Sequence, residues 1–177
     1  MTSCTEMIGK YAFKTAFIAI FVLVATFVAR PVFAADDSAQ VLQVTTKFYD
    51  DYLQRVSTLS DDSEDLVPYL SKRNDVDPSY LERLDKLITE AFEYDEEIGL
   101  DYDPILMAQE VPLVMNYGTP VINGTSAEII ANKVWMDEAA SPLCVTLTKQ
   151  DGAWRISDII DMEDEESQRD CGGMKVD

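Results

Sequence analysis

The sequence predicts an α+β fold in which N-terminal helices pack on a curved antiparallel sheet, preceded by a secretory signal. Before about residue 110, apolar residues recur with helical spacing. After Pro120 the period changes to two and β-branched residues become frequent, which is typical of strands. An apolar run near the N-terminus supplies the third observation. We therefore expect one exported domain, with helices first and strands second.

The first 34 residues have the three parts of a signal peptide. Lys10 and Lys14 precede an apolar run from Ala16 to Ala29, and Val32-Phe33-Ala34 offers a cleavage junction. The run has 14 residues, whereas a membrane-spanning helix needs about 20. We predict cleavage near Ala34 and a periplasmic or secreted protein without membrane contact afterwards. An uncleaved membrane anchor stays open as the alternative.

Removal of residues 1–34 leaves 143 residues, the size of one domain. We predict a single α+β domain at 35–162, followed by an acidic tail at 163–177. The whole chain has 14 basic and 33 acidic residues; without the signal these become 11 and 32, a net charge of −21. A chain this negative is repelled by nucleic acid. The expected partners are a small apolar ligand or a basic protein.

The absence of histidine excludes several kinds of chemistry. Ser-His-Asp and Cys-His nucleophile systems cannot form, and neither can a His-ligated zinc site. The acidic runs lack the spacing and central glycine of a calcium-binding EF-hand loop. We therefore predict no cofactor and no metal site, and any acid–base role would fall to carboxylates or tyrosines.

Two cysteines remain after processing, Cys144 and Cys171. In an oxidising compartment an even pair is usually bridged. We therefore predict a Cys144–Cys171 disulfide that ties down the acidic tail.

Four helices are expected from apolar spacing and caps. The first covers residues 41–56, and a short one begins near Pro68. The third begins at Asp77-Pro78, with Ser79 and Glu82 spaced as a capping box, and ends before Gly99. A fourth, short helix is expected from Asp103-Pro104 to Pro112. The predicted buried stripe of the third helix is Leu81, Leu84, Ile88, Ala91 and Phe92.

Three strands are expected at 127–137, 143–149 and 154–160. Asp151-Gly152 between the last two is a strong hairpin signal. Counting outward from this turn pairs Leu147 with Ile156 and Val145 with Asp158. The predicted inner face of the hairpin is then Leu143, Val145, Leu147, Trp154, Ile156 and Ile160, with Asp158 among them. A bulge near Ser157 would instead turn Asp158 outward.

The order of these pieces resembles a bacterial exported domain-of-unknown-function family related to the nuclear transport factor 2-like, or cystatin-like, superfamily. The resemblance rests on the segments Phe48–Leu53, Tyr69–Ser71, Tyr102–Ile105 and Asp151–Ile156. It implies a cone-shaped fold in which helices fill the concave face of the sheet and leave a pocket. That fold hosts enzymes, ligand binders and interaction modules, so it does not decide the function.

Asp158 is the first candidate for chemistry, because a lone carboxylate on an apolar face is costly unless paired or protonated. In isomerases of the resembling superfamily a pocket carboxylate acts as a base, and Tyr52 and Tyr102 are the candidate phenols beside it. The candidate binding residues are Asp103, Gln109, Trp135 and Trp154. Each also has a structural interpretation: a helix cap for Asp103, a surface position for Gln109, and core positions for both tryptophans.

We therefore predict a non-enzymatic binding or interaction module that uses the concave face of its sheet. One alternative is an isomerase-like or dehydratase-like enzyme with a pocket carboxylate. The other is an acidic immunity or inhibitor protein that neutralises a basic toxin or hydrolase. The sequence does not predict the oligomeric state.

Overall fold

The computed structural model describes residues 32–58, 65–136, 141–163 and 171. The predicted signal lies almost entirely outside these residues, as do most of the acidic tail and most of the loop after the first helix. One compact unit begins at Asp37, and the fold below is that of this unit. No helix in the described part of the chain is long and apolar enough to cross a membrane.

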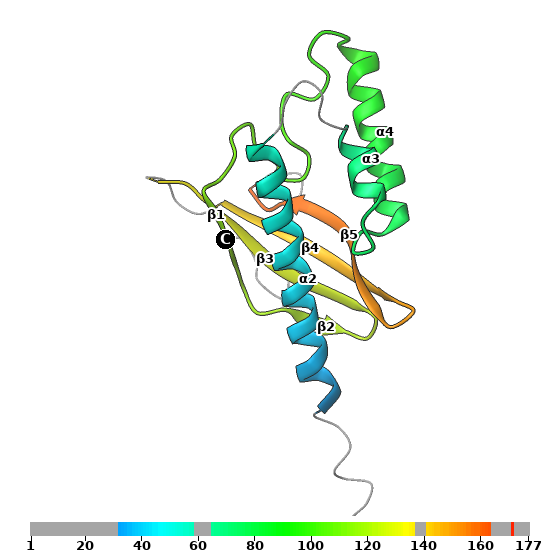
Figure 1. Cartoon of the computed structure of the whole chain (residues 1–177), viewed down its shortest axis with the longest axis vertical. Helices are drawn as coiled ribbons and strands as arrows, with labels where there is room; N and C mark the ends of the chain where they lie inside the picture. Colours follow the sequence, from blue (N-terminus) through cyan, green and yellow to red (C-terminus); the bar gives the residue numbers. More distant parts are fainter. Residues whose placement is uncertain (1–31, 59–64, 137–140, 164–170, 172–177) are drawn as a thin grey trace, which may run out of the picture. The chain divides into compact units, whose positions relative to one another are not determined.

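Helix α2 (Val32–Ser57) lies across one face of the sheet (Figure 1). The spacing of Val41, Thr45, Phe48, Tyr52 and Val56 predicts one buried stripe. The first four are buried, whereas Val56 is half-buried. The helix begins at Val32 rather than near residue 41. Val32 precedes the expected cleavage point near Ala34. Helix α3 (Leu66–Ser71) is the short helix expected near Pro68.

Helix α4 (Pro78–Tyr94) is capped by Asp77, as predicted. The Asp77 carboxylate accepts from the Ser79 backbone N–H at 2.8 Å and from the Ser79 hydroxyl at 2.7 Å. Ser79 is therefore a donor to the cap and not the capping residue itself. Tyr80 and Leu84 are buried, whereas Phe92 is exposed, so the predicted stripe is wrong at its C-terminal end.

The sheet has five antiparallel strands in the order β1-β3-β4-β5, with β2 also paired to β3. The bounds are Val114–Tyr117 for β1, Val121–Asn123 for β2, Ser126–Val134 for β3, Ser141–Gln150 for β4 and Ala153–Asp161 for β5. The last three correspond to the predicted strands. The first two were not predicted, and both lie along the same edge of β3.

The predicted fourth helix is wrong. Residues 103–108 form a closed turn in which Asp103 bridges Ala108. The Asp103 carboxylate accepts from the backbone N–H groups of Ile105 and Leu106 at 2.8 and 2.9 Å. The cap that the sequence indicates is therefore present, but the chain folds back at Ala108 before a helix can follow.

The β4–β5 hairpin contains the bulge near Ser157 that was expected as the alternative to uninterrupted pairing. Leu147 pairs with Ile156 as predicted, but Asp158 pairs with Thr146 and not with Val145. Ser157 is the extra residue, and its hydroxyl donates to the Thr146 carbonyl at 3.2 Å. The bulge moves Ile159 to the inner face in place of Ile160 and turns Asp158 to the other face.

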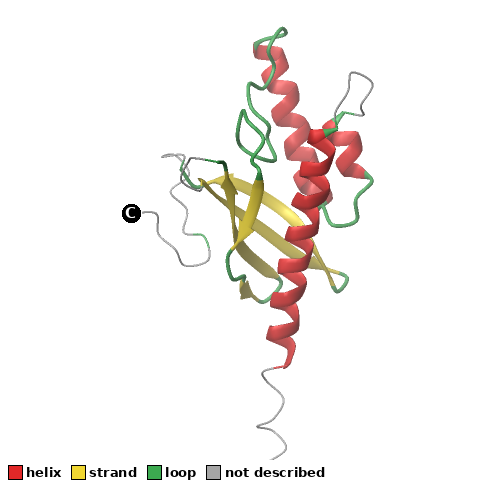
Figure 2. Ribbon diagram, turned by 60° about the vertical axis from the view of Figure 1, so that its left-hand side comes forward, coloured by secondary structure: helices red, strands yellow, loops and turns green. Residues whose placement is uncertain are grey.

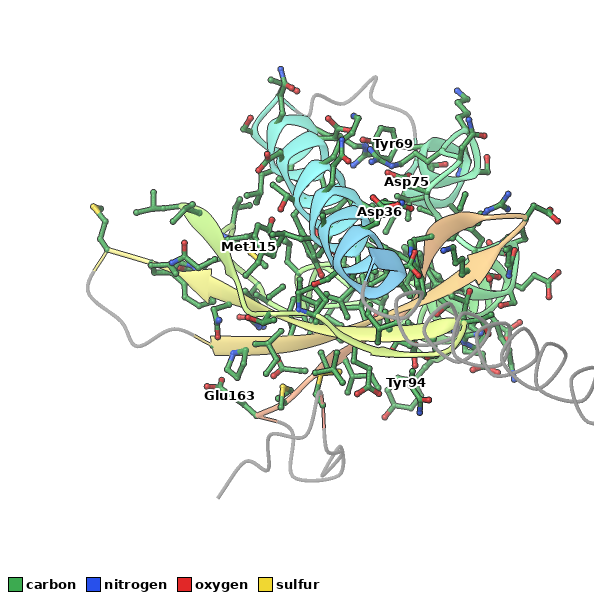
Figure 3. All side chains as sticks on the ribbon, turned by 90° about the horizontal axis from the view of Figure 1, so that it is seen from below. Asp36, Tyr69, Asp75, Tyr94, Met115 and Glu163 are labelled. Carbon is green, nitrogen blue, oxygen red and sulfur yellow. A yellow bond between two sulfur atoms is a disulfide. The ribbon has the colours of Figure 1, made fainter. Side chains whose placement is uncertain are left out.

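The sheet has two unlike faces. The helix-covered face carries Ile129, Val145, Leu147 and Ile156, all buried in one core with α2. The second face, which we call the disulfide face, carries a small cluster of Ile130, Cys144, Met162 and Cys171. Figure 3 shows α2 on one side of the sheet and Glu163 on the other. The α+β class is confirmed, while the cone-shaped, nuclear transport factor 2-like version stays a prediction.

The predicted Cys144–Cys171 disulfide is present in the structure. The two Cα atoms are 5.8 Å apart and the residues are separated by 27 positions. Both cysteines are buried in the cluster on the disulfide face. The bond therefore attaches the end of the chain to the face that α2 does not cover.

Candidate functional site

The helix-covered face of the hairpin is filled by packed side chains. Leu143, Val145, Leu147 and Ile156 are fully buried, and the aromatic rings of Phe48 and Tyr52 on α2 belong to the same core. These side chains pack against one another rather than lining a cleft. Two clefts lie along α2, and one of them also borders the hairpin turn.

Tyr52 and Asp103, two predicted site residues, contact each other. The Tyr52 hydroxyl donates to Asp103 Oδ2 at 2.7 Å, while Asp103 Oδ1 holds the amides of its own turn. Burial raises the pKa of Tyr52 well above its usual value, and the Asp103 carboxylate raises it further. Tyr52 therefore stays protonated and pins the 103–108 turn to α2. Tyr102, which directly precedes this turn in the sequence, is half-buried.

Asp158 lies on the disulfide face and not in the core. Its side chain is 33% exposed and its Oδ1 is 3.5 Å from Nη2 of Arg83. The same Arg83 nitrogen donates to the Ser157 carbonyl at 2.5 Å, so α4 contacts β5 at the bulge. The Tyr52 hydroxyl donates to Asp103, whereas Asp158 accepts from Arg83, so these contacts do not join the two predicted site residues Asp158 and Tyr52.

The candidate binding residues Trp154, Trp135 and Gln109 lie in separate places. Trp154 is buried and its Nε1 donates to Asp37 at 3.2 Å, with the Lys149 ammonium over its ring. The hydrogen bond from Lys149 lowers the pKa of Asp37. Trp135 is half-buried beyond the end of β3, with the Lys133 ammonium 5.9 Å from its ring centroid. Gln109 is exposed.

A cleft of about 640 Å³ lies between α2, residues 73–75 and the hairpin turn. Its apolar lining is Val44, Ala153 and Trp154, and its polar lining includes the Arg73 guanidinium. Arg73 binds both oxygens of Asp75 at 2.8 and 2.6 Å and Asp51 at 3.0 Å. Figure 3 shows Asp75 near Tyr69, on the same side of the sheet as α2.

The charges in this cleft are already paired. Burial disfavours the charged form of Arg73, but the Asp75 carboxylate and the Tyr69 hydroxyl together outweigh it, so the pKa of Arg73 lies above its usual value. Asp51 also accepts from Lys47, which lowers the pKa of its carboxyl group. The cleft therefore offers a partly apolar surface with a neutralised rim, not an isolated charge.

The far end of α4 and the loop after it extend beyond the sheet (Figures 1 and 2). We call residues 92–101 the acidic tip. Three large apolar side chains of the tip are exposed: Phe92 by 50%, Tyr94 by 95% and Ile98 by 62%. The exposed carboxylates of the tip are Glu93, Glu96, Glu97 and Asp101.

Local contacts give the acidic tip a defined conformation. Asp95 Oδ1 accepts from the backbone N–H groups of Glu97 and Ile98 at 3.0 and 3.1 Å. Gly99 has a φ of +62°, and its amide donates to the Asp95 carbonyl at 2.9 Å. A Cβ on Gly99 would lie 2.7 Å from the Phe92 ring, so this ring packs directly on the glycine.

The acidic tip was missed as a site because Phe92 was assigned to the buried stripe of the third helix and the residues up to Gly99 to the end of that helix. A charge count over a longer window would have found it. Residues 87–132 contain no lysine or arginine.

Within the described residues, no group of three or more His, Cys, Asp or Glu side chains is arranged to hold a metal ion.

Three solved structures resemble this fold, whereas no protein-family model and no curated protein sequence matches the chain. One is a protein of unknown function from Bacteroides thetaiotaomicron, with a TM-score of 0.50 and 18% identity, over 71% of this chain and 92% of that one. At this identity the likeness shows a shared fold alone.

Another is the type VI native effector–immunity complex Tae3–Tai3 from Ralstonia pickettii. The match has a TM-score of 0.49 and 17% identity, over 69% of this chain and 94% of that one. A selenomethionine form of the complex matches with a TM-score of 0.46 and 17% identity, over 67% of this chain and 93% of that one. Both scores are below 0.5, so nothing about this chain follows from them.

Proposed function

We propose that this protein is an exported protein-binding module of the inhibitor or immunity class, which binds a basic partner through its acidic tip. The observation that carries the proposal is the exposure of Phe92, Tyr94 and Ile98 on one protruding segment. Exposed apolar side chains rimmed by polar groups mark protein-interaction sites. Aromatic residues dominate the binding energy of such sites.

The negative charge of the acidic tip favours a basic partner. The exposed carboxylates of Glu93, Glu96, Glu97 and Asp101 alternate in sequence with the apolar side chains, and residues 92–101 include no basic residue. Such a surface repels acidic proteins and attracts basic ones, and it raises the association rate at low salt. The defined conformation of the tip lowers the entropy that binding would cost.

Export is part of the proposal. The Cys144–Cys171 disulfide supports it, because such bonds persist in oxidising compartments. We place the domain at 35–162 with the acidic tail at 163–177, after cleavage near Ala34. The order of helices before strands and the packing of α2 on the sheet support the nuclear transport factor 2-like assignment.

The test is capture from the periplasmic extract of the native host at low salt, followed by purification of the captured protein. We expect a basic protein whose binding weakens as salt increases. Tyr94→Ala should weaken the binding of the purified pair by at least about 30-fold, the effect of a central aromatic anchor. If the partner is a hydrolase, adding this protein should inhibit it.

Leu87→Ala is the matched control, because Leu87 is an exposed apolar residue on α4 outside the tip. It should leave the binding constant unchanged. If no basic protein is captured, or if Tyr94→Ala and Leu87→Ala bind the captured protein equally well, the proposal is wrong.

A small apolar ligand is the second candidate, favoured by the cleft of about 640 Å³ beside Trp154. A ligand there should change the fluorescence of Trp154, and Val44→Glu should abolish the change by placing a charge on the apolar lining. Equal changes in the wild type and in Val44→Glu would exclude this cleft as the binding site.

A further inference from the structure

The two edge strands of the sheet differ in whether another segment hydrogen-bonds to their outer side. At the β5 edge, residues 75–77 run alongside the strand: the Ile156 amide donates to the Asp75 carbonyl and the Asp77 amide donates to the Ile156 carbonyl, both at 2.8 Å. At the opposite edge, β1 and β2 each pair with β3. Among the described residues, neither strand has a neighbour on its outer side.

This open edge is uncharged. Residues 111–127, which contain β1 and β2, include no Asp, Glu, Lys or Arg, although 27% of the whole chain is charged. Natural proteins protect an exposed edge with charged side chains, with proline or by keeping its strands very short. Here the two strands are short and Gly118–Pro120 separates them, but neither strand carries a charged side chain.

Exposed apolar side chains gather at the same edge. Leu113 is 64% exposed, and Val111, Val114 and Val121 are exposed as well. A basic partner would find no carboxylate within 111–127 to bind. The edge therefore suits a partner surface that is itself apolar and uncharged, with a strand free to pair.

We propose that the β1–β2 edge is the interface of a homodimer, in which a second copy pairs its own β1 antiparallel to this one. A two-fold axis places the same patch on both sides, so an uncharged apolar strip meets an identical strip. Two molecules that each carry a net charge of −21 after signal removal repel each other. Contact along residues 111–127 brings no carboxylate of that segment against its copy, and Glu110 and Glu128 lie just outside it.

The charge argument predicts the effect of salt. Raising the salt from about 0.01 to about 1 M shortens the Debye length from about 30 to about 3 Å. This screens the repulsion between two acidic copies, so the dimer should become tighter. Binding of a basic partner to the tip should become weaker over the same range, so the two proposals have opposite salt dependence.

The test is sedimentation velocity of the exported chain across protein concentration, with two matched substitutions. Leu113→Glu puts a charge on the edge and should weaken dimerisation by at least about tenfold. Ile98→Glu places the same charge at a similarly exposed residue of the acidic tip and should leave the dimer unchanged. The expected wild-type result is a concentration-dependent dimer.

Two further variants keep the test informative if Leu113→Glu does not fold. Asn116→Lys charges an exposed residue of β1 and should also give a monomer. Leu113→Cys should form an intermolecular disulfide, and Ile98→Cys should not. The homodimer is excluded if the wild type is monomeric at its highest soluble concentration, or if Leu113→Glu and Asn116→Lys remain as dimeric as the wild type. Either result leaves the tip proposal standing.

Discussion

The two faces of the sheet are stabilised in different ways. The helix-covered face is a continuous apolar core in which Val145, Leu147 and Ile156 pack against α2. On the disulfide face, strand residues such as Thr146 and Thr148 are polar, and the buried apolar cluster is small. This face is organised by individual bonds: the Cys144–Cys171 disulfide, the cap at Asp77 and the Arg83–Asp158 pair.

We therefore expect substitutions on the two faces to change the free energy of unfolding by different amounts. Packing energy is spread over many contacts on the first face, so any large truncation leaves a cavity. On the second face, each stabilising group is local and its contribution depends on its exposure and partners.

Truncation on the helix-covered face should have the largest effect. Leu147→Ala removes a fully buried side chain, and we expect a loss of about 4 kcal/mol in the free energy of unfolding. Ile160→Ala, at a half-buried position of the disulfide face, should cost about 1 kcal/mol. Urea unfolding of both variants measures the difference. Equal losses would show that the two faces are packed alike.

Removal of the disulfide should have the next largest effect. Replacing both Cys144 and Cys171 by Ala frees the unfolded chain from a 27-residue loop, which costs about 3.5 kcal/mol in the chain-entropy model. The wild type should lose a similar amount in reductant, whereas the double variant should not respond to reductant. A wild type that is insensitive to reductant would mean that the bond does not hold this face.

The helix-covered face could be predicted well from sequence, because its signals are local. The stripe of Val41, Thr45, Phe48 and Tyr52 follows from helical spacing, and the Asp151-Gly152 turn sets the pairing of Leu147 with Ile156. The disulfide followed from the number of cysteines and the expected compartment. These predictions needed no knowledge of distant contacts.

The parts that could not be predicted depend on distant contacts or on very short segments. The bulge at Ser157 was expected only as one of two alternatives for the hairpin. It is held by Thr146 and by Arg83 of α4, so the choice between the two positions of Asp158 depends on a distant contact. Strands β1 and β2 have four and three residues, too few to show alternation. The acidic tip has no motif, and only its exposure in the fold distinguishes it as a candidate site.

Asp77 should make the disulfide face sensitive to acid. Burial raises the pKa of Asp77, but the hydrogen bonds from Ser79, Thr148 and Gln150 outweigh it, so the pKa lies below its usual 3.8. A lowered pKa in the folded state gives stability that is fully present above the unfolded value and is lost as the pH falls through the folded value.

Asp77→Ala should therefore cost about 2 kcal/mol at neutral pH, from the lost cap and the lost bonds to β4. The difference from the wild type should narrow below about pH 4. Asp85→Ala, at an exposed position of the same helix, is the control and should have almost no effect at either pH. A constant difference between Asp77→Ala and wild type from neutral pH to pH 2 would contradict the assigned role of the carboxylate.

The smallest effect is expected at Asp158, and its sign tests the orientation of this side chain. An exposed ion pair with Arg83 at 3.5 Å contributes less than about 1 kcal/mol, so Asp158→Asn should lower the free energy of unfolding by about 0.5 kcal/mol or less. High salt should remove even this loss by screening the pair.

The opposite orientation would give the opposite sign. If counting from the turn were right and Asp158 lay opposite Val145 in the core, its charge would be buried against apolar side chains. Replacing it by the neutral Asn would then stabilise the fold, because a buried carboxylate costs far more than a buried amide. A gain above about 1 kcal/mol for Asp158→Asn would therefore move the carboxylate into the core and restore it as a candidate base.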